Sequence, residues 1–349
     1  MNKTINAGVD LGLFKRVTVN IDAYKRINSG LLQQVPFQAT SGFTSNIINT
    51  GKVQNRGLEL NLNSMNIQRK DFSWDMNFNI TFNRNKVISL AGHNDVYQSA
   101  NINYKQDLIT SEGHDLYSFL LLNYRGVDPT TGNALFEQWQ DNNGNVISTA
   151  ANNGKAIKPA KVTTTTDPSK ATLEYFGGFF PKFNAGFYNE FKYKNFGFSF
   201  LIYSVYGNKT YNWAARYYWG AYDGTINTRG ILLDGLSRWK KPGDHAQVPK
   251  NEASGGLANY SSYNGFNNSR FLENGSFIRL KNVTFSYDLP ESLLSHVKIS
   301  HAQVFVKGDN LLTKSKFLGF DPESDYLQAD VDQRYPSSRK IVFGITLNF

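Results

Sequence analysis

The end of the chain carries the feature that most restricts its fold, a regular alternation of side chains over the last residues. From position 341 to position 349 every odd residue is apolar, and Gly, Thr and Asn occupy the even positions after Val342. A period of two places the apolar side chains on one face of a β-strand, and ~9–11 residues are enough for a tilted strand to cross a bilayer. Such a strand ending on an aromatic residue is typical of an outer-membrane β-barrel, where aromatic side chains lie at the membrane interface. We therefore expect a C-terminal membrane-insertion strand whose apolar face is formed by Ile341, Phe343, Ile345, Leu347 and Phe349.

The same alternation recurs along the rest of the chain. In the clearest case, residues 72–83, large apolar side chains alternate with Ser, Asp, Asn and Thr. Short turns and long loops alternate between the predicted strands, which is typical of an up-and-down antiparallel barrel with short periplasmic turns and long extracellular loops. The pattern predicts eleven strands, at 5–13, 17–24, 58–63, 72–83, 115–127, 134–139, 183–193, 196–202, 276–289, 297–308 and 339–349.

The number and direction of these strands predict a part of a larger barrel. A complete bacterial barrel has an even number of strands and both chain ends in the periplasm. The last of the eleven strands ends on the short-turn side, so the first begins on the long-loop side. Met1 is followed directly by a strand, without the charged and apolar regions of a signal peptide. We therefore expect an all-β fold, a transmembrane antiparallel up-and-down β-barrel of which residues 1–349 form the C-terminal part.

Composition narrows the remaining possibilities. No run approaches ~18 apolar residues, so no transmembrane helix is expected. The chain has no cysteine, which excludes disulfides and thiol-based sites. The net charge of +9 comes from Lys and Arg that are spread along the chain, many of them near predicted turns. This distribution favours solvated charge near anionic head groups over a nucleic-acid partner.

No arrangement of residues indicates catalysis. The histidines lie far apart in sequence or lack ligand partners, and neither a nucleophile elbow nor a phosphate-binding loop is present. Residues 141–145 resemble part of a calcium loop without its full spacing, and a plain Asn/Gly turn is the alternative. Asp321, Glu323 and Asp325 are either calcium ligands in an extracellular loop or solvated loop charge. We expect no enzyme activity, no cofactor and no metal.

Several motifs resemble the C-terminal barrel of the SusC/RagA-type TonB-dependent outer-membrane transporters. They occur in the same order as in that family and cover essentially the whole chain. The final strand, preceded by YPSSR at 335–339, resembles the end of the family's barrel. The other motifs are NTGKVQNRGLE at 49–59, WKKPGD at 239–244, FIRLKNVTFSYDLP at 277–290, VFVKGDNLLT at 304–313 and GFDPE at 319–323.

The resemblance implies a complete protein with more parts than this chain. The family's barrel has ~22 strands and a plugged lumen, so residues 1–349 would be its C-terminal half, without the plug domain and signal peptide. The implied function is TonB-dependent uptake of oligosaccharides or peptides in the outer membrane of a Gram-negative bacterium. A SusD-like surface lipoprotein and the TonB complex are the implied protein partners, and outer-membrane lipid surrounds the barrel. We expect this chain not to transport on its own.

An aromatic-rich loop supplies the candidate ligand-binding residues. Aromatic faces suit sugar rings and partner-protein surfaces, whereas an aromatic girdle at the membrane interface would use the same side chains differently. Two other functions stay open, a small passive porin or structural barrel of about twelve strands and a soluble carbohydrate-binding β-protein. The candidate contact residues are Trp213, Tyr217, Tyr218, Trp219, Tyr222 and Trp239.

Overall fold

A computed structural model shows how the alternating segments pair. It describes residues 1–36, 42, 45–90, 96–97, 108–152, 155–212, 215, 236–250, 268–294, 299–323 and 336–349. No helix among these residues is long and apolar enough to cross a membrane.

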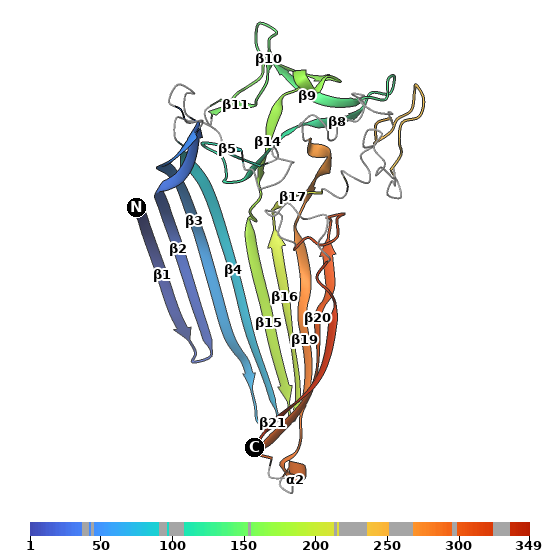
Figure 1. Cartoon of the computed structure of the whole chain (residues 1–349). Coiled ribbons are helices and arrows are strands. Elements are labelled where there is room, and N and C mark those ends of the chain that lie inside the picture. Colours follow the sequence, from blue (N-terminus) through green and yellow to red (C-terminus); the bar gives the residue numbers. More distant parts are fainter. Residues whose placement is uncertain are drawn as a thin grey trace.

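One antiparallel sheet of nine strands dominates the molecule (Figure 1). Every neighbouring pair in it is antiparallel, and the strands follow one another in chain order, as predicted for an up-and-down barrel wall. In order they are β1 (Asn2–Leu13), β2 (Val17–Pro36), β3 (Ser45–Gln68), β4 (Phe72–Ser89), β15 (Phe183–Tyr193), β16 (Phe196–Tyr206), β19 (Phe277–Asp288), β20 (His301–Ser315) and β21 (Lys340–Asn348).

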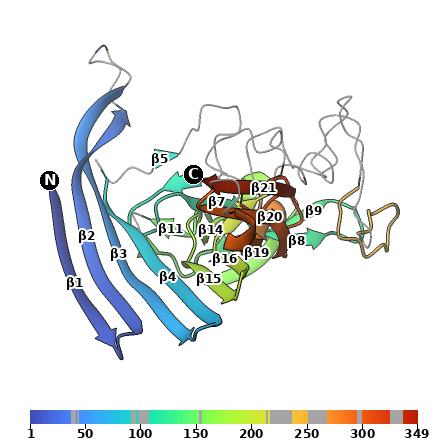
Figure 2. The same ribbon diagram turned by 90° about the horizontal axis from the view of Figure 1, so that it is seen from below.

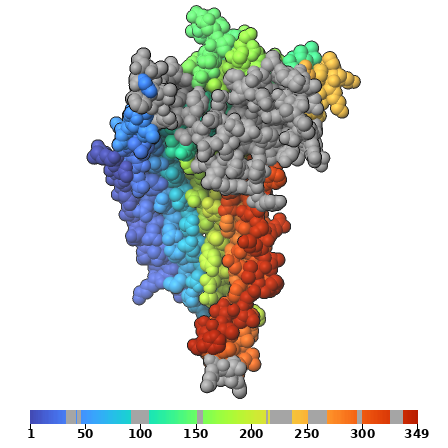
Figure 3. Space-filling model, in the orientation of Figure 1, coloured from blue at the N-terminus to red at the C-terminus, as the bar shows by residue number. Residues whose placement is uncertain are grey.

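The sheet is curved (Figure 2). Within the described residues, each of its two edge strands pairs on one side only, unlike the strands inside the sheet. Among the described strands, β1 pairs only with β2, and β21 pairs only with β20. All residues of β1 are exposed. An edge strand offers a row of unpaired N–H and C=O groups, so both edges are able to accept a further strand. In the space-filling view the strands form one continuous elongated surface (Figure 3).

The register separates an apolar face from a polar face. Phe78 in β4 lies opposite Leu62 in β3 and Phe187 in β15, while the next residue, Asn79, lies opposite Asn61 and Gly186. This is the alternation expected of a barrel wall with lipid on one side and a wet lumen on the other. Aromatic side chains continue across the apolar face, where Phe191 stacks on Trp74 and Phe198, and Phe198 stacks on Phe285.

Two of the eleven predicted strands lie outside this sheet. Residues 115–127 form β7 (Ser118–Leu122) and β8 (Tyr124–Val127), and residues 134–139 lie in β9 (Ala134–Gln140), all in smaller sheets between β4 and β15. The predicted all-β barrel class is confirmed, but the count within the described part of the wall is nine. The physical reason is burial, because every residue of β7 is buried and a membrane strand must expose one face to lipid.

These smaller sheets form a compact unit at the long-loop end, here called the loop module (residues 108–152, 155–178, 209–212 and 268–274). Phe119 and Leu121 pack with Tyr211 and Phe271, so loops from two different connections share one core. A second cluster joins Leu122, Ala134, Phe136 and Ala171.

The remaining elements are short. The strands are β5 (Val96–Tyr97), β6 (Leu108–Thr110), β10 (Val146–Ile147), β11 (Ala151–Asn152), β12 (Lys155–Ala156), β13 (Lys161–Thr165), β14 (Leu173–Gly178), β17 (Lys209–Tyr211) and β18 (Leu272–Asn274). The helices are η3 (Pro168–Lys170), η4 (Ser269–Phe271) and α2 (Glu291–Leu294).

The register explains two further features of the sequence. In residues 276–289 the apolar positions change from even (Ile278, Leu280) to odd (Val283, Phe285), and a β-bulge lies there, since the pairing of β19 shifts against both of its neighbours near Leu280 and Asn282. Residues 28–50 do not alternate cleanly and the sequence predicts a loop, yet the described residues 28–36 and 45–50 are strand, because β2 and β3 continue past the alternating segments.

Candidate functional site

The predicted membrane-insertion strand is β21, and it lies at the exposed edge of the sheet. Its apolar residues line up with apolar residues of β20, with Val304 opposite Ile345 and Val306 opposite Phe343. Phe343 is 79% exposed and Phe349 is 90% exposed, which is costly in water and favourable in lipid. The remaining predicted residues, Ile341, Ile345 and Leu347, are exposed as well. The role of this strand in membrane insertion stays a prediction.

Of the six predicted contact residues, the structure describes Trp239. Its indole N–H donates to the Pro129 carbonyl at 2.9 Å, and its backbone N–H donates to Val248 at 2.9 Å. The ring covers Gly132, where an added Cβ would lie 2.4 Å from the indole. Gly132 has a φ of +75°, the left-handed conformation that glycine adopts most readily. Trp239 thus fastens its own segment onto the turn after β8, and whether it also touches a ligand stays a prediction. The other five residues, Trp213, Tyr217, Tyr218, Trp219 and Tyr222, lie outside the described residues.

The polar face carries interlocked side chains near the short-turn end. Lys192 pairs with Glu190 at 2.9 Å, and Gln68 donates to Asp75 at 2.9 Å. Asn77 donates to Asn61 and Asn63 of the neighbouring strand. This wall suits a wet lumen or a polar surface packed against it, as the rows at Asp75, Asn77, Asn79 and Thr81 predicted.

A cationic pocket opens higher on the same face, between β19, β20 and the start of β21. Its volume is about 570 Å³, and its lining includes Lys281, Lys307, Asp309 and Lys340. Asn282 donates to Asp309 at 2.7 Å, and two of the lysines are ion-paired, Lys307 with Asp309 at 3.5 Å and Lys281 with Glu323. Lys340 adds a further cation, so the pocket suits a strongly polar group.

A buried ion-pair network holds the loop after β20 against the wall. The side chains of Arg279 and Asp321 are each 3% exposed, and their nearest charged atoms lie 2.5 Å apart. Arg279 also pairs with Glu323, which in turn pairs with Lys281. Asp321 accepts backbone N–H groups from Glu323 at 2.9 Å and from Ser337 at 2.8 Å.

Asp321 is ionised in this network. Burial opposes its ionisation, but the two backbone N–H groups and the Arg279 guanidinium outweigh burial and hold the pKa of Asp321 below its ordinary value. Two motifs of the sequence, 277–290 and 319–323, therefore meet through this pair. From the sequence, Asp321 and Glu323 were either calcium ligands or solvated loop charge. In the structure both carboxylates form ion pairs with Arg279. Asp325 lies outside the described residues.

The other candidate calcium segment is a capped turn. The Asp141 carboxylate accepts the backbone N–H groups of Asn143 and Asn145 at 2.8 and 2.9 Å, which is the Asx-type turn that such residues favour. No group of three or more potential metal ligands occurs within the residues that the structure describes.

A pair of carboxylates inside the loop module has unequal environments. Glu137 accepts the Trp139 indole N–H at 2.8 Å and pairs with Arg125 at 3.2 Å. Glu174 shares the Asn123 amide with Glu137, and its Oε1 is buried without a hydrogen-bond partner in the described part of the chain. Burial, with the neighbouring Glu137 charge, raises the pKa of Glu174 to about 7. Glu174 therefore gains or loses its proton near neutral pH.

Comparison with known proteins shows which proteins the chain is similar to. No protein-family model matches the chain. TonB-dependent receptor P3 of Formosa agariphila is 29% identical over 100% of the chain, and TonB-dependent receptor SusC of Bacteroides thetaiotaomicron is 26% identical over 99% of it. The solved structure of the RagAB peptide transporter superimposes over the whole chain with a TM-score of 0.77 and 27% identity. The chain is a relative of the SusC/RagA-type TonB-dependent receptors.

The match to the SusC/RagA type confirms the resemblance seen in the motifs, and it covers only part of each relative. The chain spans about a third of their length, 34% of receptor P3, 32% of SusC and 35% of the RagAB transporter chain. These proteins are named as receptors and transporters, so the polar face and its cationic pocket are best understood as part of a SusC/RagA-type barrel wall.

Proposed function

We propose that the protein takes up nutrients across the outer membrane by TonB-dependent import of oligosaccharides or peptides. The observation that carries this proposal is the whole-chain similarity to SusC and to the RagAB peptide transporter, joined to a barrel wall with one apolar and one polar face. Its mechanism is binding and gated translocation. The chain supplies a wall, a loop module at the long-loop end and a polar lining, and no chemistry on the substrate is required.

Three further parts belong to this proposal. A SusD-like surface lipoprotein would cover the loop end, as the pairing in the name RagAB suggests. The TonB complex would act through a segment outside this chain, and the predicted plug would lie against the polar face. Because β1 and β21 each have one partner among the described strands, we expect transport to require additional wall strands and not these nine alone.

The aromatic loop is the proposed contact region for ligand or lid. Trp239 supports this placement because it lies at the loop end, fastened to the turn at Pro129 and Gly132. Replacing Trp213, Tyr217, Tyr218, Trp219 and Tyr222 together by Ser tests the contact. Replacing four aromatic residues at the opposite end, Phe72, Tyr193, Phe196 and Tyr287, by Ser controls for the loss of aromatic area.

The uptake experiment compares a deletion of the gene with its complemented strain. Uptake of labelled oligosaccharides and labelled peptides is measured with and without a protonophore. We expect one of the two substrate classes to lose uptake on deletion and also on de-energisation. Unchanged uptake in the deletion strain would refute the proposal, and uptake that depends on the gene but survives the protonophore would favour the passive porin.

A further inference from the structure

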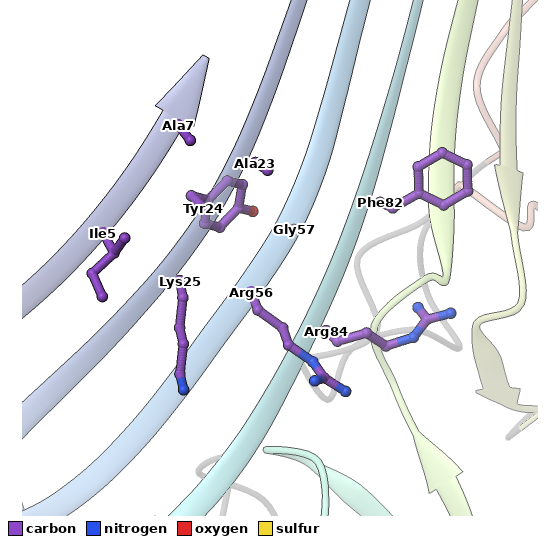
Figure 4. A pocket seen from close by; sticks show the side chains of 9 residues that line it. All are labelled: Ile5, Ala7, Ala23, Tyr24, Lys25, Arg56, Gly57, Phe82 and Arg84. Carbon is purple, nitrogen blue, oxygen red and sulfur yellow. The ribbon is translucent and has the colours of Figure 1, made fainter.

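We propose that the apolar face of β1–β4 binds the phosphate-bearing headgroup of a lipid in the outer leaflet, through a row formed by Lys25, Arg56 and Arg84. This inference rests on the assignment of the apolar face to the membrane and is independent of what the protein transports. Figure 4 shows the three side chains with the apolar residues beside them.

The register places the three cations side by side on adjacent strands. Lys25 of β2 lies directly opposite Arg56 of β3, and Arg56 lies directly opposite Arg84 of β4. All three are exposed. Like charges directly opposite one another destabilise a sheet, so a row of this kind carries a repulsion that an anion between the side chains would remove.

The protein offers this row little negative charge: one carboxylate of the loop module, Asp115, lines a neighbouring pocket with Arg56 and Arg84. Among the described residues of β1–β4, every carboxylate lies at a polar-face position, as with Asp22 and Glu59, which are opposite each other. Arg84 donates to the carbonyls of Asn83 and Lys182 at 3.1 and 3.0 Å. No ion pair joins Lys25, Arg56 or Arg84 to another residue in the described ranges. One carboxylate beside three cations leaves the row with a net positive charge, which an anion from outside the chain would neutralise.

The position of the row favours a lipid over a free anion. One step further from the loop end, the same face carries Ala7, Ala23, Leu58 and Phe82 in register. Two residues along a strand correspond to about 7 Å, which places the cations just above an apolar band. A groove of about 520 Å³ joins the two levels, and it is lined by Ile5, Ala7, Ala23, Tyr24, Lys25, Arg56, Gly57, Phe82 and Arg84.

A lipid matches both halves of this groove. Guanidinium groups bind phosphate oxygens in a bidentate manner, and acyl chains favour the apolar band. Ile5 is 74% exposed and lies opposite Lys25, so the cation level still borders apolar surface. The row lies at the long-loop end, which is the extracellular end of such a barrel, and the bound lipid therefore belongs to the outer leaflet.

The test measures lipid binding by the protein purified from outer membranes in detergent. The probe is phosphorylated lipid A, compared with the same lipid after removal of its phosphates, and binding is followed by native mass spectrometry. The variant replaces Lys25, Arg56 and Arg84 by Gln. The matched control replaces Lys15, Arg16 and Lys70 by Gln, three exposed cations in turns at the opposite end of the sheet. Heat-modifiable migration on a gel confirms that each variant is folded.

We expect the variant to bind phosphorylated lipid A about a hundredfold more weakly, from the contribution of each basic residue at an anionic surface. The control variant and a charge-conserving variant (Lys25→Arg, Arg56→Lys, Arg84→Lys) should keep most of the affinity, and the dephosphorylated lipid should bind weakly to all of them. Equal losses in the variant and the control, or equal binding of the dephosphorylated lipid, would overturn the proposal. Displacement of the lipid by millimolar inorganic phosphate would also overturn it, because the site would then recognise free phosphate.

Discussion

Replacing Asp321 by Asn should release the loop after β20 from the barrel wall. Asp321 and Arg279 are each 3% exposed, and removing one partner of a buried ion pair costs about 3–5 kcal/mol. Glu323 still pairs with Arg279 in the variant, so part of the guanidinium charge stays compensated. We therefore expect a loss of about 3 kcal/mol in the free energy of local opening, toward the lower end of that range.

Hydrogen exchange of two amides reports this loss directly. The N–H groups of Glu323 and Ser337 both donate to the Asp321 carboxylate, so their exchange requires the network to open. A loss of about 3 kcal/mol corresponds to exchange that is roughly a hundredfold faster. The measurement uses the protein purified from outer membranes in detergent, with wild type and variant exchanged at the same pH.

Asp141 offers a matched control for the loss of a carboxylate that caps backbone N–H groups. It also accepts two backbone N–H groups, but no arginine contacts it in an ion pair within the described residues, and it is only partly buried. Asp141→Asn should therefore speed exchange at its own turn only slightly. If Asp321→Asn exchanges like wild type, or if both variants change equally, the buried pair does not hold the loop.

The pH dependence of the same exchange follows from the sign of the pKa shift. The folded-state pKa of Asp321 is lowered, so its stabilising contribution is present above the ordinary carboxyl pKa and is lost only as pH falls through the lowered value. Between pH 5 and pH 8 the opening free energy should stay constant after correction for intrinsic exchange.

The remaining predictions concern the two faces and the loop module. Phe78→Arg should impair membrane assembly by ~2–4 kcal/mol, whereas Asn79→Arg on the polar face should be tolerated; equal yields of heat-modifiable protein would refute the face assignment. Glu174→Gln should stabilise the loop module at pH 8 by roughly 1–2 kcal/mol after solvent screening and have little effect at pH 5. The reason is that the pKa of Glu174 is raised to about 7 in the folded protein, so the stability of the wild type falls as pH rises from the ordinary carboxyl pKa to about 7. Thermal melts at both pH values check this, and a pH-independent effect contradicts it. Gly132→Ala should destabilise the turn by roughly 2–3 kcal/mol, because Gly132 has a positive φ and the Trp239 indole lies against it. The turn at residues 128–133 should then be cleaved faster by proteases, and an unchanged rate of cleavage contradicts the prediction.

The membrane part of the wall was predictable because lipid imposes a simple rule on it. Where a strand has lipid on one side and water on the other, as in residues 72–83 and 183–193, the side chains alternate and the strand can be recognised. The rule stops where the strand leaves the membrane. The upper parts of β2 and β3 are paired strand, yet they have no apolar alternation, and the sequence there predicted a loop.

The loop module shows the opposite failure. Residues 119–122 are apolar at successive positions because both faces of β7 are buried in a protein core, and a short apolar run of this kind does not reveal which sheet it joins. The pair between Arg279 and Asp321 was out of reach for a different reason, since its members are 42 positions apart. Charge alone left two options for the acidic residue, calcium and solvent, and neither is the arginine that the structure shows.

Arginine occurs on both faces of this wall, and its surroundings explain the difference in its expected role. On the polar face, Arg279 is buried and neutralised by Asp321 and Glu323, so its charge is used inside the protein to hold a loop. On the apolar face, Arg56 and Arg84 are exposed and lie opposite each other, and no ion pair joins either of them to a carboxylate within the described residues. A protein gains nothing from such a row in isolation, and a surrounding leaflet with anionic head groups reverses that balance. The internal pair should therefore be insensitive to the lipid supplied, whereas the external row should lose its benefit in a purely zwitterionic bilayer.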